Sequence, residues 1–280
     1  MGRYAVLWCG VSAFILRYFM LPYIHVLSRE IPMYGITTGV GVLLAVLYLK
    51  YAEKRYPELE ADVELAFVYG IVGAFVGAKI LFLVTVFPDF WADFHYLRTQ
   101  TAAFLETYLY AGFVFYGGLY GAVLSVCLYA RVAKVSAQRL LNILLPVLPL
   151  IHCMGRIGCF CAGCCYGRYS ERWGIYFFRS EIAPHDVPLL PVQLYEAVGA
   201  LLLFAGLAYM GAKKADGKKM LAVYLLAYGI MRFALEFIRG DAYRGFLLGM
   251  SVSQIISTLS VVLAAILFCW SHRKRSSAAI

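Results

Sequence analysis

Long apolar runs recur along almost the whole chain, and they constrain its fold more than any other feature. Eight of them lie near residues 4–25, 33–52, 64–87, 112–130, 140–154, 191–211, 220–238 and 248–270. A run of about 20 apolar residues can cross a hydrocarbon core roughly 30 Å thick as a helix, which satisfies its own backbone hydrogen bonds. The pattern therefore predicts an all-α, polytopic transmembrane helical bundle.

The composition is typical of a membrane protein and not of a soluble one. Hydrophobic residues make up 62% of the 280-residue chain and charged residues 15%, whereas a soluble domain has about 45–50% apolar and 25% charged residues. The net charge of +9 would suggest nucleic-acid binding in a soluble protein. In a membrane protein the placement of the cations decides their meaning, so we expect no nucleic-acid partner.

The first run differs from the other seven. It contains Arg17 and is followed by no small-residue cleavage pattern, so we predict an extra, uncleaved N-terminal hydrophobic helix in residues 1–26 and not a signal peptide. Residues 30–270 contain the other seven runs, and residues 271–280 are a basic tail. We expect residues 1–280 to form a single integral membrane domain.

The cations divide between the two sides of the predicted bundle. When the runs alternate across the bilayer, one side receives Lys54, Arg55, Arg131, Lys134, Arg139, Lys213, Lys214, Lys218, Lys219, Arg273, Lys274 and Arg275. Lysine and arginine concentrate on the cytoplasmic side of membrane proteins, so this side and the C-terminus are predicted to be cytoplasmic. The opposite side receives Arg29, Arg98, Arg156, Arg168, Arg172, Arg179, Arg239 and Arg244, with no lysine. Guanidinium groups bind phosphate through paired hydrogen bonds, so we interpret this side as the place of an anionic ligand; a chance distribution is the alternative.

Two charged residues interrupt the run near 220–238, and a third follows it directly. Arg232, Glu236 and Arg239 are spaced i, i+4 and i+7, which predicts that all three share one helical face. Charges inside membrane helices are costly and usually face a cavity or a partner. One carboxylate cannot neutralise two guanidinium groups, so a positive charge is left for a ligand anion. The alternative is a structural ion pair that orients the helix.

Lys79 and Glu196 also interrupt apolar runs. Each is a candidate partner in an intramembrane ion pair. Lys79 could equally extend along its small neighbours to the membrane surface. Glu196 lies near a predicted helix start, where the helix dipole by itself favours an acidic residue.

The stretch GRIGCFCAGCCYG, residues 155–167, contains half of the chain's eight cysteines. They are Cys159, Cys161, Cys164 and Cys165. Together with His152 they could bind a metal, but their overlapping CxC, CxxC and CC spacings are not the paired knuckles of a zinc site. In a helix, Cys161 would share a face with Cys164 or Cys165. A disulfide, buried thiols that pack as small apolar residues, and a nucleophilic thiol near arginines are the other hypotheses; we predict no metal.

Seven short motifs, in this order along the chain, resemble those of a known family. They are IPMYGI at 31–36, GAFVGAKI at 73–80, YGGLYGA at 116–122, LPLIHCMGRIGCF at 148–160, PVQLYEA at 191–197, YGIMRFALEFIRGD at 228–241 and GMSVSQIIS at 249–257. Together they resemble the phosphatidylglycerol:prolipoprotein diacylglyceryl transferases of bacterial membranes. The resemblance extends over about residues 30–270.

The resemblance implies a seven-helix core and the reaction of that family. Its members transfer the diacylglyceryl group of phosphatidylglycerol to the lipobox cysteine thiol of a preprolipoprotein, and glycerol 1-phosphate leaves. The expected partners are phosphatidylglycerol, membrane lipid and preprolipoprotein signal peptides. The expected location is the bacterial cytoplasmic (inner) membrane, with the active site toward the outer leaflet. This chemistry needs cations around a phosphate and a means of deprotonating a thiol, and it needs no cofactor.

The resemblance also assigns candidate site residues. Arg156 and Arg232 match essential arginines of the family, and Arg239 matches a further basic position. These three are the predicted phosphate-binding groups, and the first two are also predicted to be catalytic. Supporting roles in substrate binding or positioning are assigned to Glu236, Gly167, Tyr34, Gln193, Tyr195, Glu196 and Tyr228.

The chain departs from the family pattern at several positions. Tyr116 replaces a histidine proposed to assist proton transfer, and it becomes the third predicted catalytic residue. In the signature, Cys159, Ala162 and Cys164 replace two asparagines and a glutamate, and Lys79 replaces a helical arginine. Phosphate binding is therefore expected to be retained, whereas proton transfer and hydrogen bonding at the site are expected to change.

The departures leave the base and the function class open. A phenol with an ordinary pKa near roughly 10 is a poor base at neutral pH, and His152, one helical turn before Arg156, is another candidate. One alternative function is a non-catalytic phospholipid-binding or lipid-moving membrane protein, which needs arginines but no base. A divergent transferase with a different acceptor and a thiol redox or metal protein are the others.

Overall fold

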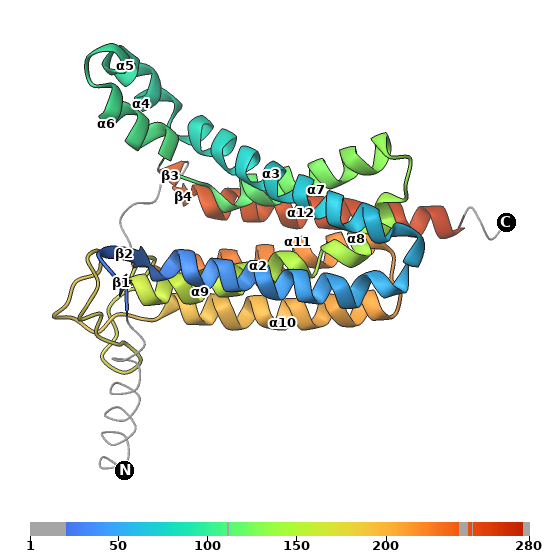
Figure 1. Cartoon of the computed structure of the whole chain (residues 1–280). Helices are drawn as coiled ribbons and strands as arrows, with labels where there is room; N and C mark the ends of the chain where they lie inside the picture. Colours follow the sequence, from blue (N-terminus) through green and yellow to red (C-terminus); the bar gives the residue numbers. More distant parts are fainter. Residues whose placement is uncertain (1–20, 111, 241–245, 248, 277–280) are drawn as a thin grey trace, which may run out of the picture. The chain divides into compact units, whose positions relative to one another are not determined.

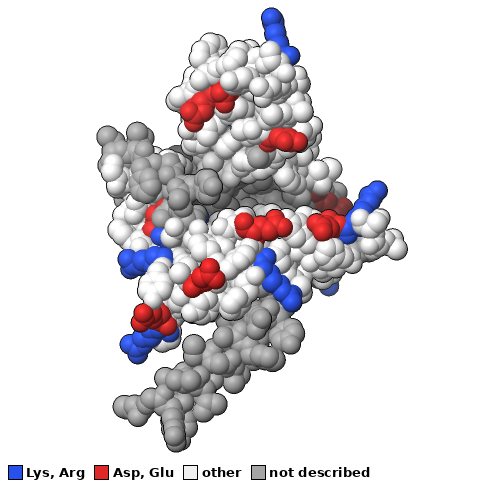
Figure 2. Space-filling view, turned by 90° about the vertical axis from the view of Figure 1, so that its left-hand side faces the viewer, with Lys and Arg blue, Asp and Glu red and all other residues white. Residues whose placement is uncertain are grey.

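The computed structural model describes residues 21–110, 112–240, 246–247 and 249–276. These residues are mostly helical, with two short two-stranded sheets (Figure 1). Within them, the helical stretches that are long and apolar enough to cross a membrane are Met33–Arg55, Pro57–Thr85, Phe115–Val132, Ala137–Ala162, Val192–Ala212 and Val252–Cys269. The prediction of an all-α, multi-pass membrane protein is confirmed. In Figure 2, uncharged side chains form most of the visible face, and the charged groups lie scattered over it.

One further long helix, α11, spans Gly217–Glu236 and has 20 residues. At 1.5 Å per residue it is about 30 Å long, which matches the hydrocarbon core. Its charged residues, Lys218, Lys219, Arg232 and Glu236, distinguish it from the six apolar stretches. The predicted run near 220–238 is therefore a helix long enough to cross a membrane. Its charged side chains serve a purpose other than contact with lipid.

The described residues group into two compact units. Unit 1 takes its residues from 1–50, 146–210 and 221–280, and unit 2 from 51–145 and 211–220. Unit 1 holds most of α2 Met33–Ala52, α9 Val147–Ala162, α10 Val192–Ala212, α11 and α12 Val252–Ser276. Unit 2 holds α3 Glu60–Thr85, α7 Phe115–Val132 and α8 Ala137–Leu144.

Small residues let the helices of unit 1 approach one another. Gly41 of α2 leaves room for Met154 of α9, and Cys153 of α9 packs in a buried cluster with Ala197 and Ala200 of α10. Figure 1 shows α2, α9 and α10 running alongside one another. Close packing of this kind favours helix association in a membrane, where burying apolar surface between helices gains little.

The predicted run near 140–154 is divided between two helices. Leu145 and Pro146 separate α8 from α9, and Pro146 is the N-cap of α9, a position where the missing N–H of proline costs no helical hydrogen bond. No residue interrupts α9 until Gly163, which has φ 71°. Residues 155–162, which follow the predicted apolar run, therefore also belong to α9.

A short hairpin precedes α2. Strand β1, Tyr23–Val26, pairs antiparallel with β2, Arg29–Pro32, around a two-residue turn in which Leu27 has φ 56°. The sequence predicts that residues 23–26 end the first helix. This prediction is wrong, because the YIHV segment, with its aromatic and β-branched residues, pairs with a neighbouring strand. The rest of the predicted first helix, residues 1–20, lies outside the described residues. A second hairpin, β3 Phe246–Leu247 and β4 Met250–Ser251, leads into α12.

The aromatic segment between the predicted runs near 64–87 and 112–130 folds into short helices of unit 2. They are α4 Phe87–Ala92, η3 Asp93–His95, α5 Tyr96–Thr99, α6 Thr101–Leu105 and η4 Glu106–Tyr110, and η1 Glu53–Arg55 and η2 Pro57–Leu59 precede α3. The rings of Phe90, Phe104 and Tyr108 pack together at centroid distances of 4.9 to 5.6 Å. Burial and the hydrogen bond to Asp93, 2.7 Å long, raise the pKa of Tyr108 to about 12. This segment is thus held together mainly by its own aromatic side chains.

Glycines bring α3 and α7 of unit 2 into backbone contact. A Cβ added at Gly77 of α3 would collide with the Gly117 carbonyl and lie 2.9 Å from the Gly121 Cα of α7. Backbone atoms cannot move aside as a flexible side chain can. We expect Gly77→Leu to lower the free energy of unfolding by about 1–3 kcal/mol or more, measured by thermal unfolding in detergent.

Gly70→Ala is the matched control in the same helix, because a Cβ there would meet only the Val126 Cγ2 at 3.4 Å. We expect its melting temperature to stay close to that of the wild type. Equal melting temperatures for the two variants would contradict the close approach of α3 and α7.

Candidate active site

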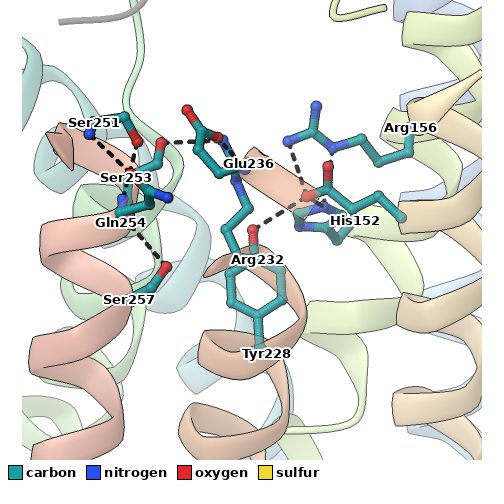
Figure 3. A network of polar contacts seen from close by, with 10 residues as sticks. His152, Arg156, Tyr228, Arg232, Glu236, Ser251, Ser253, Gln254 and Ser257 are labelled. Atoms are coloured by element: carbon teal, nitrogen blue, oxygen red, sulfur yellow. Dashed lines mark hydrogen bonds and ion pairs between the residues drawn. The ribbon is translucent and has the colours of Figure 1, made fainter. Parts of the chain in front are cut away.

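A buried carboxylate near the start of α10, that of Glu196, contacts polar groups of α9 and α11; its partners His152, Arg156 and Tyr228 are labelled in Figure 3. Oε1 of Glu196 lies 3.1 Å from Nη2 of Arg156 and 3.0 Å from Nε2 of His152, both on α9. The hydroxyl of Tyr228, on α11, donates to the same oxygen at 3.3 Å. Glu196 is only 1% exposed, and its buried charge is balanced by the arginine. The structure therefore brings together predicted residues from three helices.

His152 lies one turn before Arg156, as its spacing predicts. Nε of Arg156 lies 3.1 Å from Nε2 of His152, the same ring nitrogen that contacts Glu196. One ring nitrogen carries either a hydrogen or a lone pair. His152 therefore either donates to Glu196 or accepts from Arg156, and a change between these states would move a proton beside the arginine.

A second ion pair lies one turn further along α11. Nη1 of Arg232 is 2.5 Å from Oε2 of Glu236, and both side chains are buried. Nη2 of Arg232 donates to the hydroxyl of Ser253 at 3.0 Å. The pairing of Arg232 with Glu236 is the one that their i, i+4 spacing predicts.

Ser253 is a functional contact that sequence reasoning missed. It lies in the first turn of α12, whose start is fixed by reciprocal bonds: Ser251 N–H to Gln254 Oε1 at 3.1 Å, and Gln254 N–H to Ser251 Oγ at 3.2 Å. This Ser-x-x-Gln pattern is a capping box and could have been recognised. No spacing rule, however, connects a serine of α12 with an arginine of α11.

Arg239 does not share the helical face of Arg232 and Glu236, so that prediction is wrong. Helix α11 ends at Glu236, and the next residues turn away. Arg239 forms an isolated antiparallel bridge with Gly167, and the Gly240 N–H binds the Tyr166 carbonyl at 3.1 Å. The backbone of Arg239 and Gly240 pairs with the segment after α9, and this pairing takes the place of a further turn of α11.

Gly167 has a backbone role in this bridge. Its N–H donates to the Leu190 carbonyl at 2.8 Å, and an added Cβ would lie 2.6 Å from Leu190 Cβ and 2.8 Å from the Ile238 carbonyl oxygen. Only a glycine leaves room for three chain segments here. The close approach joins the ends of α9 and α11, the two helices that carry the arginines.

Two other predicted residues lie beside the end of α9. The Gln193 amide donates through Nε2 to the Cys164 carbonyl at 2.6 Å. Tyr34, at the start of α2, packs against Gly158, where an added Cβ would lie 3.0 Å from the Tyr34 Cα. Tyr195, by contrast, is 40% exposed, and no hydrogen bond of the described residues joins it to the Glu196 network. Neighbours on a helix point about 100° apart, which separates Tyr195 from Glu196.

Tyr116 and Lys79 belong to unit 2. Tyr116 is 3% exposed, near the start of α7, and its ring stacks on Tyr120 at 6.4 Å. Lys79 Nζ donates to the carbonyls of Gly112 at 2.9 Å and Tyr108 at 3.3 Å. Lys79 therefore ties the segment before α7 to α3, a contact that neither sequence hypothesis included.

The signature cysteines lie where α9 ends. Gly163 adopts a left-handed conformation; its N–H binds the Phe160 carbonyl at 3.1 Å, and the Cys164 N–H binds the Cys159 carbonyl at 3.1 Å. This is a Schellman motif, which folds the chain back over the last helical turn. It places Cys164 next to Cys159, five residues earlier.

The sulfur atoms of Cys159, Cys164 and Cys165 lie within 4.8 Å of one another. The cysteines in the described part of the chain are free thiols. Cys161 is not in this group, and its predicted shared face with Cys164 or Cys165 is wrong because α9 ends at Ala162, before either residue. These three thiols, hereafter the thiol cluster, are the described side chains best placed to bind a metal.

Charge within the thiol cluster is unevenly distributed. Hydrogen bonds from the Cys159 and Cys164 thiols, and then the positive charges of Arg156 and Arg239, lower the pKa of Cys165. Hydrogen bonding to Cys159 and Cys165, together with burial, raises the pKa of Cys164. Within the cluster, Cys165 is thus the thiol whose ionisation its surroundings favour most.

The Arg156 guanidinium is anchored on one edge only. Its Nε and Nη2 face His152 and Glu196, whereas Nη1 makes no hydrogen bond among the described residues and points away from that carboxylate in Figure 3. The Arg156 side chain is 13% exposed, so Nη1 is accessible. A guanidinium anchored on one edge can present its other N–H groups to a phosphate.

Together, the fold and the site define a multi-pass helical membrane protein with ion-paired arginines on α9 and α11 of unit 1. Residues 22–270 match the family model described as "Prolipoprotein diacylglyceryl transferase", and the chain belongs to this family. The resemblance inferred from seven motifs is therefore confirmed over nearly the same residues.

Relatives in several bacteria carry the name phosphatidylglycerol–prolipoprotein diacylglyceryl transferase. The protein of Clostridium tetani is 30% identical over 236 residues, 84% of this chain and 91% of the relative. The protein of Clostridium perfringens named phosphatidylglycerol–prolipoprotein diacylglyceryl transferase 2 is 30% identical over 246 residues, 87% of this chain and 92% of the relative. The protein of Rickettsia felis is 31% identical over 250 residues, 86% and 92% respectively. The similarity thus covers almost the whole length of these relatives.

Proposed function

We propose that this protein transfers the diacylglyceryl group of phosphatidylglycerol to the lipobox cysteine thiol of preprolipoproteins and releases glycerol 1-phosphate. Family membership and the names of the relatives support this reaction. The structural observation that carries it is the Arg156 guanidinium, fixed on one edge by His152 and Glu196 and accessible on the other. Such a preorganised cation stabilises a phosphate as it leaves.

The reaction breaks the bond between the glycerol carbon and the phosphate oxygen of the lipid. The acceptor sulfur attacks that carbon, a thioether forms, and the phosphate takes the bonding electrons. Arg156 would bind the phosphate oxygens directly. Arg232, held by Glu236 and Ser253, would support the same charge, and Arg239 would contribute from the segment paired with Gly167.

The thiol must lose its proton before it attacks. Tyr116 occupies the position of the family histidine, and its phenol can donate a hydrogen bond but is a poor base. His152 is a better proton acceptor by chemistry, because an imidazole accepts a proton near neutral pH more readily than a phenol does. We assign Tyr116 to substrate hydrogen bonding and keep His152 as a candidate acceptor.

The protein would act in the bacterial cytoplasmic (inner) membrane. Phosphatidylglycerol and the signal peptides of preprolipoproteins are its proposed partners. The arginine-only side of the chain would face the outer leaflet, and the lysine-rich side and the C-terminus would be cytoplasmic. This orientation places Arg156 where a lipid headgroup can reach it from the bilayer.

Transfer of labelled phosphatidylglycerol to a lipobox peptide in proteoliposomes tests this function. Labelled thioether product and released glycerol 1-phosphate are expected. A matched peptide with serine in place of the lipobox cysteine should remain unlabelled. Binding of phosphatidylglycerol without any product would favour the lipid-binding alternative and refute the transferase.

The substitution Tyr116→His restores the residue type of the family. If proton transfer limits the rate, turnover in the same assay should stay equal or rise, because an imidazole is a better base at neutral pH. Tyr120→His, one turn further along α7, is the control and should bring no gain. A severe loss in Tyr116→His alone would show that the site has been rebuilt around the phenol.

A further inference from the structure

The thiol cluster has the geometry of a metal site. The sulfur atoms of Cys159, Cys164 and Cys165 lie within 4.8 Å of one another. Metal–sulfur bonds of about 2.3 Å put the sulfurs of a tetrahedral zinc site roughly 3.8 Å apart. Small rotations of the thiols would reach that separation. Soft thiolate ligands of this kind select zinc and similar thiophilic cations.

The backbone holds this geometry in two unusual conformations. Gly163, with φ 71°, closes the Schellman motif that brings Cys164 back to Cys159, and Cys165 itself has φ 59°. A residue with a Cβ rarely adopts the left-handed region, and such strain persists where the surrounding structure imposes it. The strained residue is one of the three that point a thiol into the cluster.

A buried acceptor without a partner lies against the same loop. Gln193 is 1% exposed, and its Nε2 is fixed by the Cys164 carbonyl at 2.6 Å. Its Oε1 has no hydrogen-bond partner among the described residues. Buried carbonyl oxygens are normally satisfied. This unmatched buried acceptor belongs to the residue that binds the loop carrying Cys164 and Cys165.

Accessibility favours an open site over a closed structural one. Cys159 is buried, whereas Cys164 and Cys165 are partly exposed. Three protein ligands with one open position are the arrangement of catalytic zinc, while structural zinc is closed by four. Cys165 lies two residues before Gly167, which forms the backbone bridge with Arg239, a proposed phosphate ligand. A ligand at the open position would therefore lie near the segment that carries Arg239.

In place of the sequence-based expectation of no metal, we propose that Cys159, Cys164 and Cys165 bind one thiophilic divalent cation of the Zn²⁺ type and leave its fourth position for the thiol of the acceptor peptide. The second half of this statement rests on the proposed transferase function. A thiol that coordinates such a cation loses its proton to solvent. Its sulfur then attacks the glycerol carbon of the lipid, the carbon–oxygen bond breaks, and glycerol 1-phosphate leaves with the bonding electrons. This route supplies a deprotonated thiol in a chain that has Tyr116 at the position where the family usually has a histidine.

Metal binding is tested on the reduced, full-length protein in detergent. Titration with Cd²⁺ should give a sulfur-to-cadmium charge-transfer band that saturates at one ion per chain. Cys159→Ser, Cys164→Ser and Cys165→Ser should each lose the band. Cys161→Ser, which removes a buried thiol from the same helix but outside the cluster, should keep it. Circular dichroism on every variant separates lost ligands from lost folding.

Three results would overturn the metal site. They are no band in the wild type, an equal loss in Cys161→Ser, and a disulfide between two members of the cluster in protein isolated with thiols blocked. None of these measurements requires lipid turnover. The metal site can therefore be refuted while the transferase function stands, and the transferase function can be refuted while the metal site stands.

The open position is tested with the Co²⁺-substituted protein. A lipobox peptide with its cysteine should shift the visible Co²⁺ absorption, and the matched serine peptide should not. The Arg156→Ala variant should show the same shift, because peptide coordination does not depend on lipid. A saturated Co²⁺ site that does not respond to the cysteine peptide would refute the role in thiol activation and leave the cation structural.

Discussion

Replacing Arg156 with alanine is expected to lower diacylglyceryl transfer by about 100- to 1,000-fold, the usual loss when one preorganised donor to a developing negative charge is removed. Arg156 is the guanidinium with an accessible edge, through Nη1, while its other edge is anchored by His152 and Glu196. The change removes both the phosphate ligand and the counter-charge of a buried carboxylate. The measurement is initial rate with labelled phosphatidylglycerol and a lipobox peptide in proteoliposomes.

Two further variants separate these effects. Arg156→Lys keeps a charge but loses the fork that contacts Glu196 and phosphate together, so most of the activity should still be lost. Arg156→Ala combined with Glu196→Gln relieves the buried charge and should restore thermal stability without restoring turnover. Near-normal transfer in Arg156→Ala would remove the main support for the proposed site.

Arg232→Ala is expected to have the largest effect on stability. The Arg232 and Glu236 side chains are 6% and 3% exposed and lie 2.5 Å apart. Breaking a buried ion pair from one side leaves an uncompensated charge and costs about 3–5 kcal/mol. We expect a clear drop in the detergent melting temperature and, in whatever protein remains folded, a large loss of transfer.

The double variant Arg232→Ala with Glu236→Ala provides the control. Because neither charge remains buried, it should recover most of the stability that the single change removes. Ser253→Ala removes only the hydrogen bond to Nη2 of Arg232 and should have a smaller effect. If Arg232→Ala melts at the temperature of the wild type, the pair is not buried as described.

The two ion pairs also explain how positive charge is retained for a ligand. From the sequence, one carboxylate, Glu236, had to serve two arginines of the same face. In the structure Glu236 pairs with Arg232, and Glu196 of another helix pairs with Arg156. Charge is therefore largely balanced within the site. The proposed binding of phosphate therefore depends on the unshared edge of Arg156 and not on an unpaired row of arginines on one helical face.

The sequence by itself determined the membrane-crossing helices and the contacts one helical turn apart. Runs of about 20 apolar residues predict spanning helices because the hydrocarbon core sets their length. The pairing of Arg232 with Glu236 and of His152 with Arg156 follows from 3.6 residues per turn. The family resemblance depends on the same local motifs, each short and continuous along the chain.

Only the tertiary structure decided which distant groups meet. Glu196 reaches Arg156 from another helix, and Ser253 reaches Arg232, through packing that no spacing predicts. The thiol cluster depends on a left-handed turn at Gly163, which ends α9 and selects Cys159 over Cys161 as the neighbour of Cys164. Backbone pairing with Gly167 removed Arg239 from its predicted helical face. Local periodicity fixes neighbours along one helix, whereas turns and interhelical contacts fix the partners of a site.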